Sequence, residues 1–195
     1  MAIVIFTVLL KIVMFPLTVK QVNSMKKMQE LQPKIQEIQK KHKDNPQKSQ
    51  QMVMEIYQKE KVNPFAGCLP LLVQMPILFA LFSALRTFFD PAVHPEVNLQ
   101  HANFLWISNL GEPDLYILPL LAAGATFAQQ WFSMVNKNDH TQKTFLYIMP
   151  IFMGWISRSF PSGLALYWVV YSVVSAVEHL LIRRNTGVVK EAAKG

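Results

Sequence analysis

The stretch AIVIFTVLLKIVMFPLTV, residues 2–19, is a run of apolar residues with one lysine, Lys11, near its middle. Roughly 20 apolar residues are needed for an α-helix to cross the hydrocarbon core of a bilayer. Four further stretches have a similar composition, so the predicted spans lie at about residues 2–19, 65–85, 115–135, 144–160 and 162–182. The sequence therefore predicts an all-α integral membrane protein with five transmembrane helices.

The charges of the loops predict how these spans are oriented. Residues 20–61 contain ten lysines and five acidic residues, whereas residues 86–113 contain one arginine and three acidic residues. The connection 136–143 and the tail 183–195 are basic again. Because lysine and arginine are enriched on the cytoplasmic side, we expect the N-terminus outside and the C-terminus in the cytoplasm.

The first loop, at about residues 23–61, shows two apolar stripes with helical spacing. Between them lies the turn sequence KDNP, residues 43–46. We predict a cytoplasmic antiparallel helical hairpin, with its first arm starting afresh near Pro33, because proline disfavours the helix interior. The hairpin is either a solvated connector or a mobile arm whose basic surface meets the ribosome, lipid headgroups or a partner protein. The stripes comprise Met28, Leu31, Ile35 and Ile38, and Met52, Val53, Ile56 and Tyr57.

The outer loop, at about residues 86–113, contains the aromatic sequence HANFLWISNL, residues 101–110. Aromatic side chains of this kind suit the headgroup level of a membrane. One prediction is a short interfacial helix. The alternative is a lid packed over the ends of the spans.

Polar residues inside the predicted spans extend from the middle of the membrane towards the cytoplasm. Lys11 and Gln74 fall near the midplane, and Gln129, Gln130 and Glu178 lie closer to the cytoplasmic side. A lysine that faces lipid at the bilayer centre costs about 2.5–3.5 kcal/mol on insertion scales. We therefore expect Lys11 to face a hydrated cavity that is open to the cytoplasm and closed to the outside.

An ion pair between Lys11 and Glu178 is the alternative, since Glu178 is the one acidic residue inside a predicted span. We expect this pair to be the weaker explanation, because Glu178 falls close to the cytoplasmic end and Lys11 does not. Glu178 is expected instead to reach the interface or to pair with Arg183 or Arg184.

Composition and motifs argue against an enzyme or a metal protein. The 19 basic and 12 acidic residues give a net charge of +7, but the excess is grouped in loops and predicts no specific nucleic-acid partner. Cys68 is the one cysteine, and the five histidines lack ligand spacing. No phosphate-binding loop, H-E-x-x-H or G-x-S-x-G motif is present. We expect no catalytic residues, no metal and no cofactor.

Four stretches then indicate a family: FPLTVKQVNSMKKMQELQPKI (residues 15–35), KVNPFAGCLPLLVQMPILFALF (61–82), FLWISNLGEPDLYILPLL (104–121) and FPSGLALYW (160–168). Together they closely resemble the YidC family of membrane protein insertases. The resemblance implies one insertase core domain over residues 1–195, with a hydrophilic groove open to the cytoplasm and to lipid. It implies the shorter Gram-positive type, without a large outer domain before the first span and without a long basic tail.

The resemblance also assigns groove residues. Lys11 stands where the family has an arginine, so the charge is kept while the planar five-donor fork is lost. The substrate-binding groove that the resemblance implies comprises Lys11, Thr7, Gln74, Met75, Tyr167, Trp168, Gln129 and Gln130.

The function implied is insertion of nascent hydrophobic segments into the bilayer without nucleotide hydrolysis, and help with the folding of membrane proteins. The expected partners are nascent membrane proteins and lipid, with the Sec translocon and the ribosome as further candidates, and the protein is expected to act as a monomer in the bacterial plasma membrane. A small-solute anion transporter or channel is the alternative, and an assembly chaperone is a third. The first apolar stretch lacks the basic region and cleavage site of a signal peptide, and the natural chain could begin upstream of Met1.

Overall fold

The computed structural model describes residues 1–63, 69–88, 103–134 and 140–185. Predictions that concern Cys68, the first part of the outer loop, the connection after residue 134 and the end of the tail lie outside these residues. The helices are α1 (Ala2–Lys41), α2 (Pro46–Lys59), α3 (Leu69–Phe88), α4 (Ile117–Ser133), α5 (His140–Ser157) and α6 (Ser162–Asn185).

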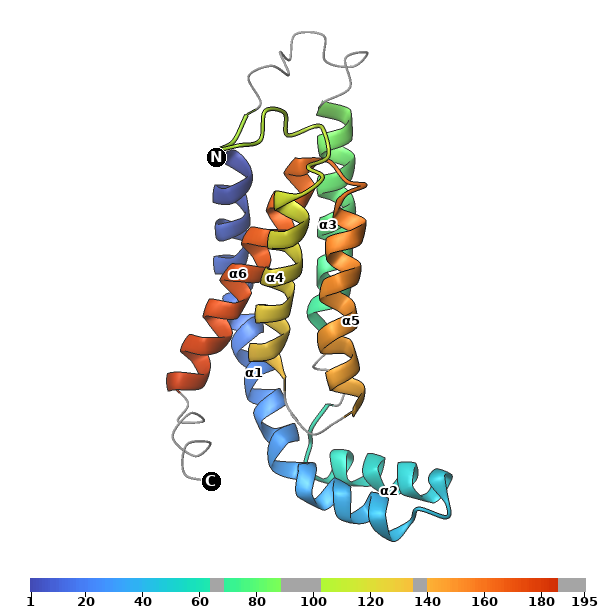
Figure 1. Ribbon diagram of the computed structural model, residues 1–195. Helices are drawn as coiled ribbons and strands as arrows, with labels where there is room; N and C mark the ends of the chain where they lie inside the picture. Colours follow the sequence, from blue (N-terminus) through green and yellow to red (C-terminus); the bar gives the residue numbers. More distant parts are fainter. Residues whose placement is uncertain (64–68, 89–102, 135–139, 186–195) are drawn as a thin grey trace.

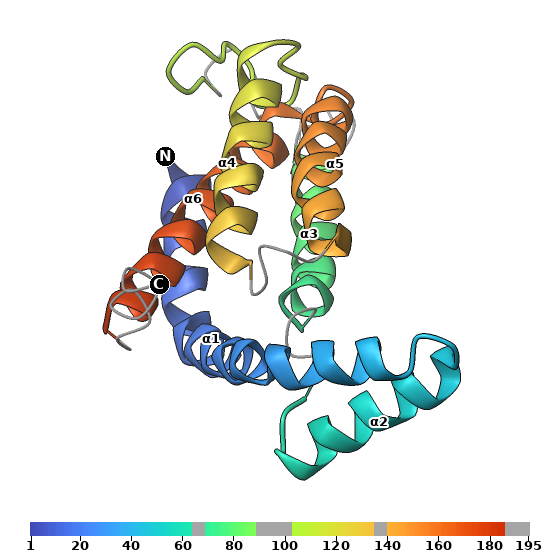
Figure 2. The same ribbon diagram turned by 60° about the horizontal axis from the view of Figure 1, so that its bottom comes forward.

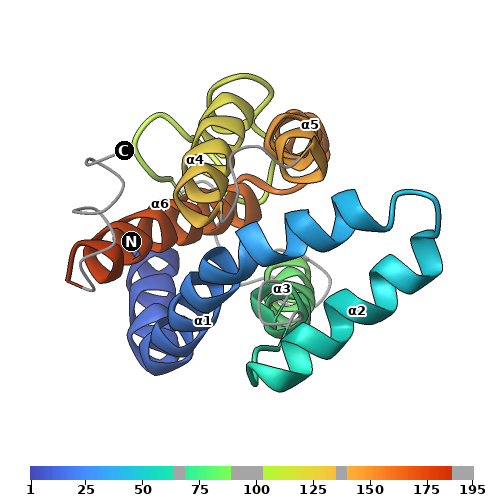
Figure 3. The same ribbon diagram turned by 90° about the horizontal axis from the view of Figure 1, so that it is seen from below.

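The first part of α1 forms a bundle with α3, α4, α5 and α6, and the hairpin of α1 and α2 projects at one end (Figures 1 and 2). Helix α6 packs against α1 and α4, and α4 also packs against α5, whereas α3 has fewer neighbouring residues in α6. Figure 1 shows that α6 crosses the bundle obliquely. Seen from the hairpin end, α2 lies beside the last part of α1 (Figure 3).

Outside the hairpin, the outer surfaces of the bundle helices are largely apolar. On α5, the exposed side chains include Phe145, Ile148, Ile151, Phe152 and Trp155. By length and composition, α1 and the segment Ser162–Ile182 could each cross a membrane, and Leu72–Phe88 is a shorter apolar helix. A helix occurs in each of the five stretches predicted to span the bilayer, while the five crossings and their orientation stay a prediction.

The predicted helical hairpin is present as a pair of packed helices, and its cytoplasmic location stays a prediction. Its core contains the buried Leu31, Ile35 and Val62, against which four partly buried side chains pack. In the turn, the side chain of Asn45 accepts a hydrogen bond from the Lys48 N–H at 3.1 Å, and Pro46 is the first residue of α2. The four partly buried residues are Met28, Val53, Ile56 and Tyr57.

The predicted interruption at Pro33 is wrong, because α1 continues from Ala2 to Lys41 with Pro33 inside it. A proline inside a helix removes one backbone hydrogen bond and favours a bend, at a cost of about 3 kcal/mol. Leu31 and Ile35, on either side of Pro33, are both buried against the other arm. This packing offsets the cost of the proline.

The interfacial helix predicted for the outer loop is also wrong where the structure describes it. Phe104 and Ile107 form an isolated antiparallel bridge around a tight turn, in which Leu105 has a φ of 52°. Ile107 is buried with Leu118 of α4 and Ala165 of α6. The alternative, a lid packed on the ends of the helices, describes this segment.

Backbone groups of the lid also cap α6. The Glu112 carbonyl accepts hydrogen bonds from the N–H of Ser162 at 2.8 Å and from its hydroxyl. The Leu110 carbonyl accepts the N–H of Gly163 at 2.9 Å. The first N–H groups of a helix lack partners within it, so these contacts fix the lid to the start of α6.

Candidate functional site

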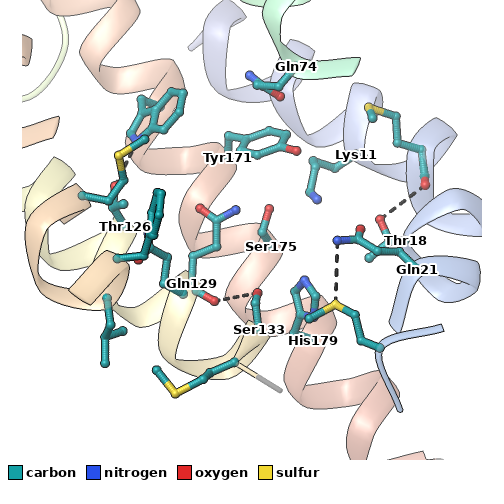
Figure 4. A pocket seen from close by; sticks show the side chains of 18 of the residues that line it. Lys11, Thr18, Gln21, Gln74, Thr126, Gln129, Ser133, Tyr171, Ser175 and His179 are labelled. Carbon is teal, nitrogen blue, oxygen red and sulfur yellow. Dashed lines mark hydrogen bonds between the residues drawn. The ribbon is translucent and has the colours of Figure 1, made fainter. Parts of the chain in front are cut away.

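A cavity of about 400 Å³ lies inside the helix bundle and is lined by residues of α1, α3, α4, α5 and α6. Many of the lining side chains are polar, although the surrounding helices are apolar on their outer faces. Figure 4 shows the side chains of Lys11, Gln21, Gln129 and Ser175 around this space. The polar and charged lining residues are Lys11, Thr18, Gln21, Gln74, Thr126, Gln129, Gln130, Ser133, Gln142, Ser175 and His179.

Lys11 is buried in this site and has two close partners. Its Nζ lies 2.5 Å from Glu178 Oε2 and 4.6 Å from the centre of the Tyr171 ring. Only 4% of Lys11 and 8% of Glu178 is exposed. A carboxylate and an aromatic face both stabilise a buried ammonium.

The ion pair corrects the expectation that Glu178 would be too far along its helix to meet Lys11. Because α6 is oblique (Figure 1), its residues advance less along the bundle than those of an upright helix. The cavity and the ion pair, treated as alternatives from sequence, therefore occur together.

Two further hydrogen bonds join helices around the cavity. The Gln74 side-chain amide of α3 donates to the Tyr167 hydroxyl of α6 at 2.7 Å, and Gln74 Oε1 is buried without a hydrogen-bond partner among the described residues. The Trp168 indole of α6 donates to the Thr126 hydroxyl of α4 at 2.9 Å. These bonds fix the walls of the cavity and leave one amide oxygen available to accept a hydrogen bond.

The structure brings five of the eight predicted groove residues together in the lining: Lys11, Gln74, Gln129, Gln130 and Trp168. The other three lie outside it. Thr7 is fully buried and its hydroxyl donates to the Ile3 carbonyl at 2.6 Å, and Tyr167 is fully buried behind Gln74. Met75 is exposed on α3. A role in substrate binding stays a prediction for all eight.

Sequence reasoning did not select several lining residues, although their spacing carries a signal. On α1, Lys11, Met14, Thr18, Gln21 and Met25 follow one another at intervals of 3, 4, 3 and 4 residues, which places them on one face. On α6, Tyr171, Ser175 and His179 are each four residues apart. Following the face of Lys11 along its own helix would have found Thr18 and Gln21.

In the part of the chain that the structure describes, no three histidine, cysteine or acidic side chains lie close enough together to hold a metal ion. The side chains around the cavity provide one ion pair and several amides and hydroxyls, set among apolar side chains such as Met14, Leu17 and Leu146.

Comparison with known proteins places this site in a family. The model of the family described as 60Kd inner membrane protein matches residues 1–190. A membrane protein insertase YidC from Fusobacterium nucleatum is 41% identical over 186 residues, which cover 94% of this chain and 85% of the relative. One from Oceanobacillus iheyensis is 45% identical over 197 residues, covering 94% and 74% of the two chains.

A crystal structure of an active YidC insertase, with its first transmembrane domain resolved, has a similar fold. The TM-score is 0.71 at 26% sequence identity, and the match covers 90% of this chain and 40% of that one. The length of the matches and the shared fold both show that this chain is a membrane protein of the YidC family of membrane protein insertases, which are not enzymes.

Proposed function

We propose that this protein moves nascent hydrophobic segments from the cytoplasm into the lipid bilayer through the cavity at Lys11, without nucleotide hydrolysis. The observation that carries the proposal is a buried lysine in a cavity that also presents several amides and hydroxyls, inside a bundle whose outer faces are apolar. Such a cavity provides polar contacts at a depth where lipid provides none. The similarity of the chain to membrane protein insertases also supports this function.

The proposed arrangement in the membrane has five crossings, an outer N-terminus and a cytoplasmic C-terminus. The lysine-rich hairpin and the lid are then on opposite sides, as their charges favour. In this orientation the cavity begins near the middle of the bilayer and continues towards the hairpin, because it is lined by Lys11 and by residues further along α1 such as Gln21 and Met25.

In the proposed mechanism, a polar flank of the nascent segment enters the cavity and contacts Lys11, Gln74 and the α4 glutamines. Gln74 Oε1 is suited to accept a hydrogen bond from a peptide N–H, because it is buried and lines the cavity. The apolar part of the segment then moves into lipid, driven by burial at roughly 25 cal/mol per Å² of apolar area. The membrane potential adds about 2.3 kcal/mol per charge per 100 mV for an acidic flank that moves outward.

The remaining predicted groove residues take different positions in this mechanism. Thr7 and Tyr167 are fully buried, so they would reach a substrate only if neighbouring helices moved apart. Met75 is exposed on α3 and would contact the apolar part of a segment at the lipid boundary. Partnership with the Sec translocon and the ribosome, and action as a monomer, belong to the same proposal.

Reconstitution tests the function directly. Purified protein in liposomes receives a small single-span substrate, and insertion is measured by protease protection, with photo-crosslinkers at positions 11, 74 and 168. We expect protected insertion and crosslinks from the three positions. Lys11→Gln should impair substrates with acidic flanks most. Anion flux without insertion would contradict the proposal and favour a transporter.

A further inference from the structure

Glu178 is a buried acidic residue that the proposed insertion mechanism does not use. Its carboxylate contacts the Lys11 ammonium, and both residues are more than nine-tenths buried. Taking the proposed function as given, we propose that Glu178 determines substrate specificity: its carboxylate competes with acidic residues of the arriving segment for Lys11, and so limits the preference of the groove for acidic flanks.

The position of the pair relative to the cavity is the first support. Lys11 lines the cavity, as do Ser175 and His179, which flank Glu178 on α6, whereas Glu178 is not among the described lining residues. A segment in the cavity therefore contacts the Lys11 ammonium directly. It is affected by the Glu178 carboxylate only because that carboxylate is paired with Lys11. The attraction that the segment experiences is that of the positive charge of Lys11, weakened by the nearby negative charge of Glu178.

Electrostatics at short range gives the second support. Two opposite charges in contact nearly cancel at a distance, so a paired lysine attracts an incoming carboxylate much less than a lone one. An ammonium has three N–H donors, so Lys11 can hold Glu178 and a second carboxylate together while the partners exchange. An acidic flank must then compete for Lys11, and a neutral flank has no such requirement.

A purely structural ion pair between α1 and α6 makes a different prediction. Removing one partner would leave an unpaired buried charge and weaken the bundle, and this would reduce insertion of every substrate by a similar factor. Competition for Lys11 instead changes the ratio between substrates that differ only in the charge of the flank. The ratio therefore separates the two roles.

The experiment uses one single-span substrate with three flanks, carrying two aspartates, two asparagines or two lysines, and the full-length protein in liposomes. We expect Glu178→Gln to raise acidic-flank insertion relative to asparagine-flank insertion by roughly three- to tenfold. Lys11→Gln should change this ratio in the opposite direction. The double variant Lys11→Gln with Glu178→Gln, which leaves no unpaired charge, should make insertion nearly independent of the flank.

Glu112→Gln is the matched control, because it removes an exposed carboxylate that accepts a hydrogen bond from Asn109 in the outer lid. It should leave the flank ratio unchanged. The inference is overturned if Glu178→Gln leaves the ratio at the parent value, or, where that variant does not accumulate, if the double variant has the same ratio as Lys11→Gln, because these two differ only in the Glu178 carboxylate. Absence of insertion of all three flanks by the parent protein would instead contradict the proposed function.

Discussion

At the scale of single residues, a charged lysine inside an apolar bundle needs neighbours that offset the free-energy cost of removing its charge from water. Removing an ammonium from water costs several kcal/mol even after the protein relaxes. Lys11 recovers this cost through Glu178, the ring of Tyr171 and the polar cavity beside it. A lysine is a compact charge on a flexible stem, whereas arginine is a planar fork. The one close carboxylate and the ring face suit the former, so charge rather than a bidentate contact accounts for this site.

Tyr167→Phe should loosen α3, because it removes the hydroxyl that accepts the Gln74 amide. Both side chains are buried, and α3 has few neighbouring residues in α6. Hydrogen bonds between helices in membranes contribute about 0.6 kcal/mol on average and up to about 1.7 kcal/mol. We expect a loss of stability in this range, measured by unfolding in detergent. Tyr147→Phe, at an exposed position of α5, is the control, and an equal loss in both variants would contradict the assigned role of the bond.

At the scale of elements, the hairpin depends on a small apolar core rather than on its many charges. The Lys34–Glu60 pair that joins the arms is 3.2 Å long but exposed, and exposed pairs contribute little. Ile35, in contrast, is 4% exposed. The hydrophobic contacts therefore hold α2 against α1.

Ile35→Ala should separate the arms of the hairpin. Large-to-small substitutions in a core cost about 2–5 kcal/mol, and the hairpin core has few other members. We expect faster cleavage by trypsin at the hairpin lysines, with cleavage elsewhere unchanged. Met54→Ala, at an exposed position of α2, should leave the cleavage rate at the parent value. Equal rates for the two variants would show that this core does not hold the hairpin together.

The start of α4 is stabilised by Asp114. Burial acts to raise the pKa of its carboxyl, but hydrogen bonds from the Tyr116 N–H, the Trp106 indole and the Ile117 N–H outweigh it and hold the pKa below the usual value. A lowered pKa in the folded state gives stability that is present above the unfolded pKa of about 3.9 and is lost as the pH falls through the folded value.

Asp114→Asn keeps an oxygen that can accept hydrogen bonds but removes the charge, so it should reduce stability at pH 7 by about 0.3–1 kcal/mol, the typical contribution of a negative charge near the start of a helix. The difference from the parent should shrink as the pH falls through the lowered pKa of Asp114, because the parent carboxyl is then itself protonated. Unfolding in detergent between pH 2.5 and pH 7 measures both effects. The exposed Asp44 of the hairpin turn provides the control variant Asp44→Asn. A loss of stability that is the same at every pH would contradict the role of the charge.

The elements also show what local patterns can and cannot predict. The hairpin was predictable because its stripes and the KDNP turn are local signals, and both are present in the structure. For the outer loop, composition left two alternatives open, an interfacial helix and a packed lid, and the burial of Ile107 against α4 and α6 decided between them. The Lys11–Glu178 pair depends on the oblique path of α6, which no pattern within one helix encodes.

At the scale of the whole molecule, apolar side chains lie on the outside of the bundle and charged and polar side chains lie inside, which is the opposite of a water-soluble helical bundle. Exposed side chains of α5 such as Ile151 and Trp155 are apolar, while the interior contains the ion pair and a cavity lined in part by amides and hydroxyls. Lipid takes the place of water around such a bundle, and polar residues then face inwards. The hairpin and the lid lie at opposite ends of the bundle (Figure 1). Once one of them is known to lie on one side of the membrane, the other must lie on the opposite side.

The proposed orientation predicts which end each side of the membrane can reach. With Cys68 changed to serine, single cysteines are introduced at the exposed Ser108 of the lid and Gln50 of the hairpin. A membrane-impermeant maleimide should label Ser108→Cys in intact cells, and Gln50→Cys only after permeabilisation, because the lysine-rich hairpin is expected in the cytoplasm. Labelling in denaturant controls for expression and thiol reactivity. The reverse pattern would place the hairpin outside and exclude entry of a nascent cytoplasmic segment at that end. Labelling of both cysteines in intact cells would show that the two ends share one side, which a bundle of membrane-crossing helices between them does not permit.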